Sequence, residues 1–408
     1  MKGSGGDDKV VQKNARLAAV VAAVAVAAVA GGGAFAHQQR PQAGGTAAAP
    51  LQVQSSRPTP SLTPSAVPST PAPPSSSTPA ATPKPPGTPP TTPAPSNPVE
   101  IPVDLAALAK GRNPAVTYRS DREVRGGGPT IKIPGSQRIE RFARLGDDVL
   151  AVVGTDGSTT DLLVIGAGHP TRRVPNADTL VTNKQGTAAA YTTVRLNAEG
   201  MVTRGGALHH LSATGATKTL DFPDDTFALK VVALVDGKVY YRSIDEQAGD
   251  VDRLYEWTPG TTTPKLVKTV TESRILSEDG RYSTSWRNAS AGVCNAVHVV
   301  ATGKKLWETC KGDLTDFTPD SRVTISRGYA GKTPMVRIAA QDTKTGKLIH
   351  AWTGFFANAV AEDDQHVLIS TEGATGGSLV RCVIATGDCE FAVPLSNAEL
   401  RLDPGMTP

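Results

Sequence analysis

Three kinds of hydrophobic patterning follow one another along the chain. Residues 17–36 form a run of apolar and small residues without a charge, and residues 37–100 contain almost no large apolar residue. The remainder carries short β-branched runs that Gly, Asp and Pro interrupt every eight to twelve residues. The first run is long enough to cross a membrane as a helix, and the short runs are typical of β-strands. The pattern therefore predicts a membrane segment, a linker and one all-β domain.

Basic residues dominate the sixteen positions before the apolar segment: Lys2, Lys9, Lys13 and Arg16, against Asp7 and Asp8. This excess predicts that residues 1–16 stay in the cytoplasm and that the chain beyond residue 36 is exported. The segment 17–36 is either an uncleaved single-pass transmembrane helix in the cell membrane or a signal peptide. In the second case, cleavage near Ala36 would release a secreted protein. We expect the anchored form, because a long spacer is useful only when one end is held.

The spacer itself is rich in Pro, Thr and Ser over residues 37–100. Such a composition cannot bury enough apolar surface to offset the entropy of ordering, so we expect a disordered linker. In an extended polyproline-like conformation it could span up to about 180 Å, at ~3.1 Å per residue.

A repeat of nearly constant length occupies residues 101–408. Turn glycines recur with spacings of 40, 47, 45, 43, 43 and 41 at Gly128, Gly168, Gly215, Gly260, Gly303, Gly346 and Gly387. A second series of turns, such as Asp236-Gly237 and Asp279-Gly280, precedes these glycines by about 23 residues. One four-stranded unit per repeat, stacked radially, predicts a seven-bladed β-propeller.

The first repeat is incomplete, because it supplies only three strands: AVTYR, REVRG and TIKIP. A short helix is expected to precede it, with Asp104 as its N-cap and LAALAK as its body. The missing innermost strand is then expected from residues 398–402 (AELRL), which would join the two ends of the domain. Six blades with an N-terminal closing strand are the alternative.

Two repeats resemble a known family. The segments LSEDGRYSTSW (276–286) and FTPDSRVTIS (317–326) are each followed by a Thr-Gly-Lys hairpin, and they resemble the repeats of WD40-like, TolB-type β-propellers. The resemblance implies a scaffold. It implies no particular functional residue, because these repeats specify blade structure.

All four cysteines lie beside two of the repeated hairpin turns. Cys294 and Cys310 are symmetrically placed about the turn Ala301-Thr302-Gly303, and Cys382 and Cys389 flank the equivalent turn at Gly387, one residue off that register. Directly opposed residues of a hairpin are close enough to bridge. In an oxidising compartment we expect two structural disulfides, Cys294–Cys310 and Cys382–Cys389, each within one blade.

Composition argues against several classes of function. The chain has 42 Lys and Arg against 38 Asp and Glu, with no basic block interleaved with aromatic residues, so nucleic acid is not an expected partner. Gly331-Lys332-Thr333 lacks the first glycine of a phosphate-binding loop, and no Cys-x-x-Cys pair occurs. We identify no candidate catalytic, cofactor-binding or metal-binding residue and expect no cofactor.

The loops between the second and third strands of each blade are the expected ligand-binding end. The acidic loop from Asp245 to Asp252 is one of them, either a solvated charge run or part of a binding surface, with 195–207, 328–334 and 372–378 as neighbours. The leading hypothesis is a membrane-tethered, non-catalytic module that binds a protein or an envelope component. The alternatives are a propeller enzyme (hydrolase, lyase or quinoprotein) and an accessory sensor subunit. An enzyme would place two or more acidic or histidine side chains together in the central channel.

Overall fold

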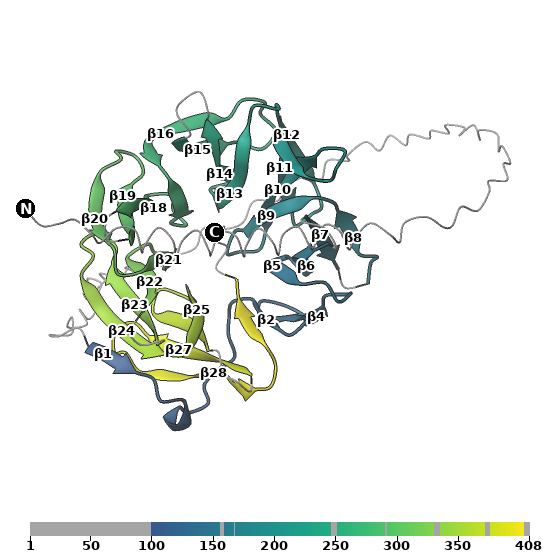
Figure 1. Ribbon diagram of the computed structural model, residues 1–408. Helices are drawn as coiled ribbons and strands as arrows, with labels where there is room; N and C mark the ends of the chain where they lie inside the picture. The colour runs from purple at the N-terminus through teal and green to yellow at the C-terminus, as the bar shows by residue number, and fades with distance from the viewer. Residues whose placement is uncertain are drawn as a thin grey trace, which may run out of the picture. The chain divides into compact units, whose positions relative to one another are not determined.

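The computed structural model describes residues 99–403, apart from 156–158, 167, 246–250, 290–291, 330–334 and 372–375. Seven sheets surround a central axis (Figure 1), so the seven-bladed propeller is confirmed and the six-bladed alternative is wrong. The predicted membrane segment 17–36 and the linker up to residue 98 lie outside the described residues. Within the described ranges, no helix is long and apolar enough to span a bilayer.

Each blade contains four antiparallel strands that follow one another from the central axis outward, and blade 6 has a fifth strand at its outer edge. Blade 1 contains β29 (Leu400–Leu402), β2 (Tyr118–Ser120), β3 (Glu123–Arg125) and β4 (Ile131–Lys132). Blade 2 contains β5 (Ile139–Leu145), β6 (Asp148–Gly154), β7 (Thr160–Ile165) and β8 (Arg172–Val174). Blade 3 contains β9 (Ala177–Thr182), β10 (Ala188–Leu196), β11 (Val202–Ser212) and β12 (Thr217–Phe222). Blade 4 contains β13 (Phe227–Val235), β14 (Lys238–Asp245), β15 (Val251–Trp257) and β16 (Lys265–Thr271).

The last three blades repeat this order. Blade 5 contains β17 (Ser273–Leu276), β18 (Tyr282–Ala289), β19 (Gly292–Val299) and β20 (Lys305–Thr309). Blade 6 contains β21 (Asp313–Phe317), β22 (Val323–Tyr329), β23 (Val336–Asp342) and β24 (Leu348–Gly354). Blade 7 contains β25 (Phe356–Ala361), β26 (His366–Thr371), β27 (Gly377–Val383) and β28 (Cys389–Ser396).

The hydrophobic core lies between neighbouring blades. Val181 and Leu208 of blade 3, for example, belong to one buried cluster with Val231, Tyr241 and Trp257 of blade 4. A second strand such as β6 (DVLAVVG) is buried along most of its length, because blades cover both of its faces. The outermost strand β16 (KLVKTVT) is largely polar and exposed. Strands near the axis therefore have continuous apolar sequences, and strands at the rim have sequences that mix apolar and polar residues.

The ring closes in blade 1 as the sequence predicted. β29, from the C-terminal end of the domain, pairs antiparallel with β2 through Tyr118–Leu402 and Ser120–Leu400. The Leu402 carbonyl accepts a bond of 3.4 Å from the Asn358 side chain of blade 7, and the Asp403 carboxylate accepts one of 2.9 Å from the Phe142 N–H of blade 2. The C-terminal end of the closing strand is thus bonded to blade 7 and blade 2, the two blades that flank blade 1.

The segment that precedes blade 1 lies along the outer edges of blades 6 and 7. Strand β1 (Val99–Pro102) pairs parallel with β24 as a fifth strand of blade 6 (Figure 1). The expected helix is only one 3₁₀ turn, Leu105–Ala107, which Asp104 caps by accepting a 3.0 Å bond from the Ala106 N–H. It ends early because the backbone of Ala109 and Gly111 bonds instead to Phe391 of β28. The domain boundary predicted at residue 101 falls inside β1.

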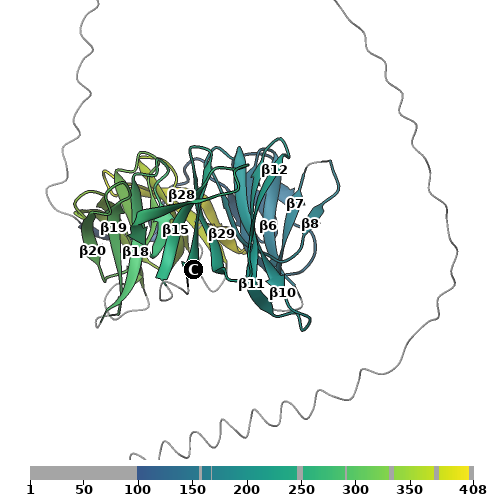
Figure 2. The same ribbon diagram turned by 90° about the horizontal axis from the view of Figure 1, so that it is seen from above.

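The strands run between two faces of the ring (Figure 2). What we call the turn face carries the first-to-second and third-to-fourth strand turns of each blade, such as those at Asp236-Gly237 and Gly303. What we call the connection face carries the second-to-third strand loops, such as 197–201, and the links between blades, such as Phe355.

Candidate functional site

Both predicted disulfides are present, and each lies within one blade. In blade 5 the hairpin closes through a bond from the Val299 N–H to the Lys304 carbonyl, so the turn is one residue longer than expected. A bulge between Val297 and His298 shifts the register back, which places Cys294 opposite Cys310 as predicted. In blade 7, Cys382 and Cys389 lie on the turn side of the corresponding shift and are direct partners. This explains the one-residue offset between the two pairs.

The cysteines of blade 5 do not form a metal centre. The Glu308 carboxylate lies within 4.8 Å of both Cys294 and Cys310, and three such ligands could hold a cation. The two sulfurs are joined to each other, however, so neither is available as a thiolate. Within the described ranges, no other group of three potential ligands comes this close together.

A cavity of about 430 Å³ occupies the central channel toward the turn face, and all seven blades contribute to its wall. Its lining includes four carboxylates: Glu278, Asp316, Glu362 and Asp403. Each of these carboxylates has a protein partner. The Glu278 carboxylate is 2.9 Å from the Lys184 ammonium, so this ion pair joins blade 5 to blade 3 across the channel.

The other three carboxylates bond to backbone groups. Asp316 accepts hydrogen bonds of 2.8 and 2.9 Å from the N–H groups of Phe317 and Ala361, which links blade 6 to blade 7. Desolvation in the channel wall raises the pKa of Asp316, and the Lys184 ammonium and the bonded N–H groups only partly offset this effect. Asp403 links blade 1 to blade 2 through its bond from Phe142. These groups join blades, and within the described ranges no three of the four carboxylates offer oxygens within 4.8 Å of one another.

Glu362 forms a buried ion pair with Arg381 of β27. The side chains are 0% and 2% exposed, and Glu362 Oε1 lies 2.8 Å from Arg381 Nη2. Glu362 also accepts a 2.7 Å bond from the Ala115 N–H, while Arg381 donates to the carbonyls of Arg112 and Asn113. Burial alone would raise the pKa of Glu362, but the bonds from Arg381 and Ala115 lower it overall. The pair fixes the segment that leads into blade 1.

A second buried charge cluster lies between blades 4 and 5. Asp252, the last residue of the predicted acidic loop, is 8% exposed and accepts a 2.5 Å bond from Arg242. Burial raises the pKa of Asp252 despite Arg242 and the neighbouring Arg274. Burial and Arg242 together lower the pKa of Arg274, whose guanidinium lies 4.6 Å from the centre of the Trp286 ring. Asp252 therefore faces the protein interior and is unavailable to a ligand, contrary to the expectation for this loop; residues 246–250 lie outside the described ranges.

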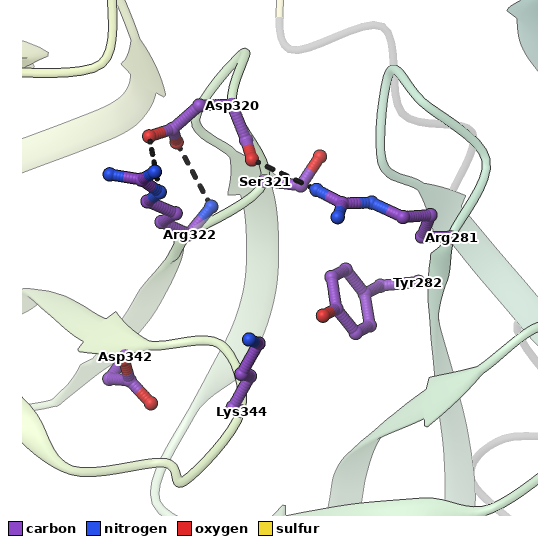
Figure 3. Close-up of a pocket in the computed structure, with 7 residues that line it drawn as sticks. All are labelled: Arg281, Tyr282, Asp320, Ser321, Arg322, Asp342 and Lys344. Carbon is purple, nitrogen blue, oxygen red and sulfur yellow. Dashed lines mark hydrogen bonds and ion pairs between the residues drawn. The ribbon is translucent and has the colours of Figure 1, made fainter.

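A smaller cavity of about 380 Å³ opens on the turn face between blades 5 and 6, and we call it the rim pocket. Its wall is formed by three turns and consists of Arg281, Tyr282, Asp320, Ser321, Arg322, Asp342 and Lys344 (Figure 3). Three of these side chains are cationic. The pocket coincides with the two segments, 276–286 and 317–326, that carry the family resemblance, because their turns form two of its sides.

Exposed large apolar side chains occur on the connection face. The described residues of this kind lie at strand ends or loops of that face in blades 3 to 7: Met201, Val202, Phe227, Val293, Tyr329, Phe355 and Leu395. The strand register confirms their placement, since Val202 pairs with Leu196, Phe227 with Ile244 and Tyr329 with Val336, all at the same end of their blades. Among the described side chains of this type, none lies on the turn face. Solvent-exposed aromatic, Met and Leu side chains gathered on one face are typical of protein interaction sites.

Topology and closure define the protein as a β-propeller of seven blades. The solved structures similar to it include the propeller domain of the Trilobed protease from Pyrococcus furiosus, at 11% identity over 63% of this chain and 86% of that chain, with a TM-score of 0.44. TolB from Acinetobacter baumannii is similar at 12% identity over 58% and 65%, with a TM-score of 0.37. An acylaminoacyl peptidase from Pyrococcus horikoshii is similar at 10% identity over 63% and 46%, with a TM-score of 0.44. No family model matches the sequence, and no curated protein does so.

Sequence reasoning missed the rim pocket and the Glu362–Arg381 pair. For the rim pocket, a comparison of the segments 276–286 and 317–326 contained a signal, because Ser321 takes the place of Gly280 between an aspartate and an arginine. For the Glu362–Arg381 pair there was no such signal. Glu362 directly follows β25 and Arg381 lies in β27, and their backbone partners at 112–115 lie more than 240 positions away.

Proposed function

We propose that the protein is a non-catalytic binding module whose connection face holds a protein partner outside the cytoplasm. The observation that carries this proposal is the restriction of the exposed large apolar side chains to that face, among the residues that the structure describes. The most exposed, Tyr329 and Phe355, are 68% and 64% accessible in blade 6 and at its link to blade 7. Leaving such side chains in water is unfavourable by about 25 cal/mol per Å² of apolar surface, and a partner would remove that cost.

The channel supports a structural role more than a catalytic one. General acid–base chemistry needs a titrating group within reach of substrate, with its lone pairs or proton available. In the channel, Asp316 and Asp403 are bonded to backbone N–H groups, and Glu362 is held by Arg381. The alternative of a propeller enzyme gains no specific support from these contacts.

Site-specific photo-cross-linking in the native cell envelope tests the proposal. A photoreactive amino acid replaces Phe355 of the connection face in one form of the full chain and Lys347 of the turn face in a control form. Both positions are exposed, so neither change should disturb the fold. We expect a discrete protein adduct from position 355 and none from 347. Equal adducts from both positions, or adducts to envelope polymer alone, would contradict binding of a protein partner by this face.

The same proposal includes export. The cations before residue 17, the apolar segment 17–36 and the long linker support a tether that places the propeller at the cell surface. The alternative accessory-sensor function would use the cytoplasmic residues 1–16, which offer few groups for a contact.

A further inference from the structure

The rim pocket lies on the turn face, opposite the proposed partner-binding surface, and the two are independent. Its acidic side chains are bonded within their own turns. Asp320 Oδ1 accepts bonds of 2.8 and 3.0 Å from the Thr318 hydroxyl and the Arg322 N–H, and Asp342 Oδ1 accepts bonds of 2.8 and 2.6 Å from the N–H and hydroxyl of Thr345. These carboxylates therefore shape the wall of the pocket and have little capacity to bind its contents.

The cationic groups keep donors available toward the cavity. Arg281 is bonded to Asp279 on one edge and donates a 3.3 Å bond to the Asp320 carbonyl on the other, which holds its guanidinium across the boundary between the two blades. For the Lys344 ammonium, no ion pair or hydrogen bond occurs within the described ranges. Figure 3 shows the Lys344 ammonium, the Arg281 guanidinium and the Tyr282 hydroxyl around the same opening. These three donor groups face a common volume.

Ser321 is a backbone anomaly at the back of this pocket. Its φ angle is 62°, in the left-handed region, whereas glycine occupies the equivalent position in blade 5 with a φ of 67°. A non-glycine residue is disfavoured there, and such outliers concentrate at functional sites. The Ser321 side chain is buried and lies beside Asp279 of blade 5. Burial acts to raise the pKa of Asp279, but hydrogen bonds from Arg281 and from the Ser277 hydroxyl lower it overall. The hydrogen bonds on Asp279 keep its carboxylate ionised and next to the Arg281 guanidinium.

From this arrangement we propose that the rim pocket binds an oxyanion group, a phosphate or a carboxylate, carried by a small polar molecule or a polymer unit. The Lys344 ammonium and the Arg281 guanidinium supply the positive charge, and the Tyr282 hydroxyl supplies a neutral donor. Charge-assisted hydrogen bonds to oxyanions are stronger than neutral ones. A cavity of about 380 Å³ is larger than a single ion needs and falls within the range of small-molecule sites.

Three related sugars test the proposal with the full chain at low ionic strength. Glucose 6-phosphate and glucuronate carry a phosphate and a carboxylate on the same ring, and glucose is the neutral control. Isothermal titration calorimetry should detect at least one of the two anions and should not detect glucose. A heat of binding for both would indicate a general oxyanion site, and one for a single anion would identify the group that is recognised. No binding of either anion at about 10 mM, which corresponds to a negligible affinity, would overturn the proposal.

Two lysine variants of the same turn separate this site from general surface charge. Lys344→Ala should weaken anion binding by about tenfold or more, while Lys347→Ala, an exposed lysine that does not line the pocket, should leave it within about twofold. Tyr282→Phe should give an intermediate loss with unchanged salt dependence, because only a neutral donor is removed. Equal affinity of the Lys344→Ala variant and the unmodified chain would overturn the assignment. Both lysines are exposed, so misfolding should not obscure the comparison.

Discussion

Glu362 Oε1 lies 2.8 Å from Arg381 Nη2 in the interior of blade 7, and the two side chains together bond to backbone groups of the segment that leads into blade 1. Replacing Arg381 by Met should lower the free energy of unfolding by about 3–5 kcal/mol, because Glu362 is left as a buried charge without its cationic partner and with only the Ala115 N–H bonded to it. The second change Glu362→Gln should restore part of this loss. Chemical denaturation measures both. The control is Arg125→Met, which breaks an exposed pair with Glu123 and should cost at most about 1 kcal/mol.

The same pair predicts a pH dependence. The pKa of Glu362 is below its ordinary value of 4.5 in the folded protein, so its ion pair stabilises the fold fully above that value. The stabilisation should be lost as the pH falls through the lowered folded-state pKa. Stability measured by urea denaturation should therefore decline more steeply in acid for the unmodified protein than for the Glu362→Gln variant. Parallel acid profiles for the two proteins would contradict this role.

Gly387 of the last hairpin is a contact point between blade 7 and β1. A Cβ at this position would lie 2.3 Å from Ile101 Cδ1 and would meet the His350 ring at 3.1 Å, and the φ angle is +82°. Gly387→Ala should therefore displace β1 and cost about 1–3 kcal/mol in overpacking beyond the penalty for a left-handed alanine. Limited proteolysis should cut near residues 99–113 in this variant.

A matched control exists in blade 3. Gly215 has a φ of +84°, and a Cβ there would meet nothing within 4 Å. Gly215→Ala should lower the free energy of unfolding by about 1 kcal/mol, the cost of an alanine at a positive φ angle, without new cleavage near β1. If both variants were equally stable and equally resistant to protease, the close approach of Gly387 to Ile101 would not contribute to the free energy of unfolding.

Each of the two disulfides links outer strands within a single blade, whereas the hydrophobic core lies between blades. Replacing Cys294 and Cys310 by Ser should lower stability by about 1–3 kcal/mol without changing the fold, because the hairpin already restricts the closed loop. Circular dichroism and thermal unfolding of the variant check this expectation. In the unmodified protein, peptide mapping without reduction should link Cys294 only to Cys310 and Cys382 only to Cys389. A peptide that links the two hairpins would be incompatible with the blade assignment.

Cell fractionation tests the tether. We expect the protein in the membrane fraction, with residues beyond 40 open to protease added outside intact cells. An N-terminal sequence that starts at His37 would identify cleavage after Ala36 and a secreted form. A cytosolic pool that external protease does not reach would contradict export.

The blades were predictable because their turns repeat. Gly303, Gly346 and Gly387 occupy the same left-handed position in successive hairpins, with φ angles of 70°, 70° and 82°. That constraint leaves a periodic trace in the sequence, and the closing strand followed from the missing strand of the first repeat. The candidate sites left no comparable trace. The rim pocket depends on Lys344 and Arg281 from different blades, and the apolar face depends on which ends of the strands share a side, so both emerge only when the ring is assembled.

Strand β1 determines how mechanical load would enter the domain. Four residue pairs, from Val99–His350 to Pro102–Thr353, attach it to β24 of blade 6, whereas the ring is closed in blade 1 by β29 and β2. Tension on the chain ahead of Val99 therefore passes into blade 6 and then, through Lys110 and Gly111, along blade 7. The β29–β2 pairing that closes the ring lies beyond these attachments. A pulling force would therefore detach β1 first, and the seven blades would remain assembled during that step.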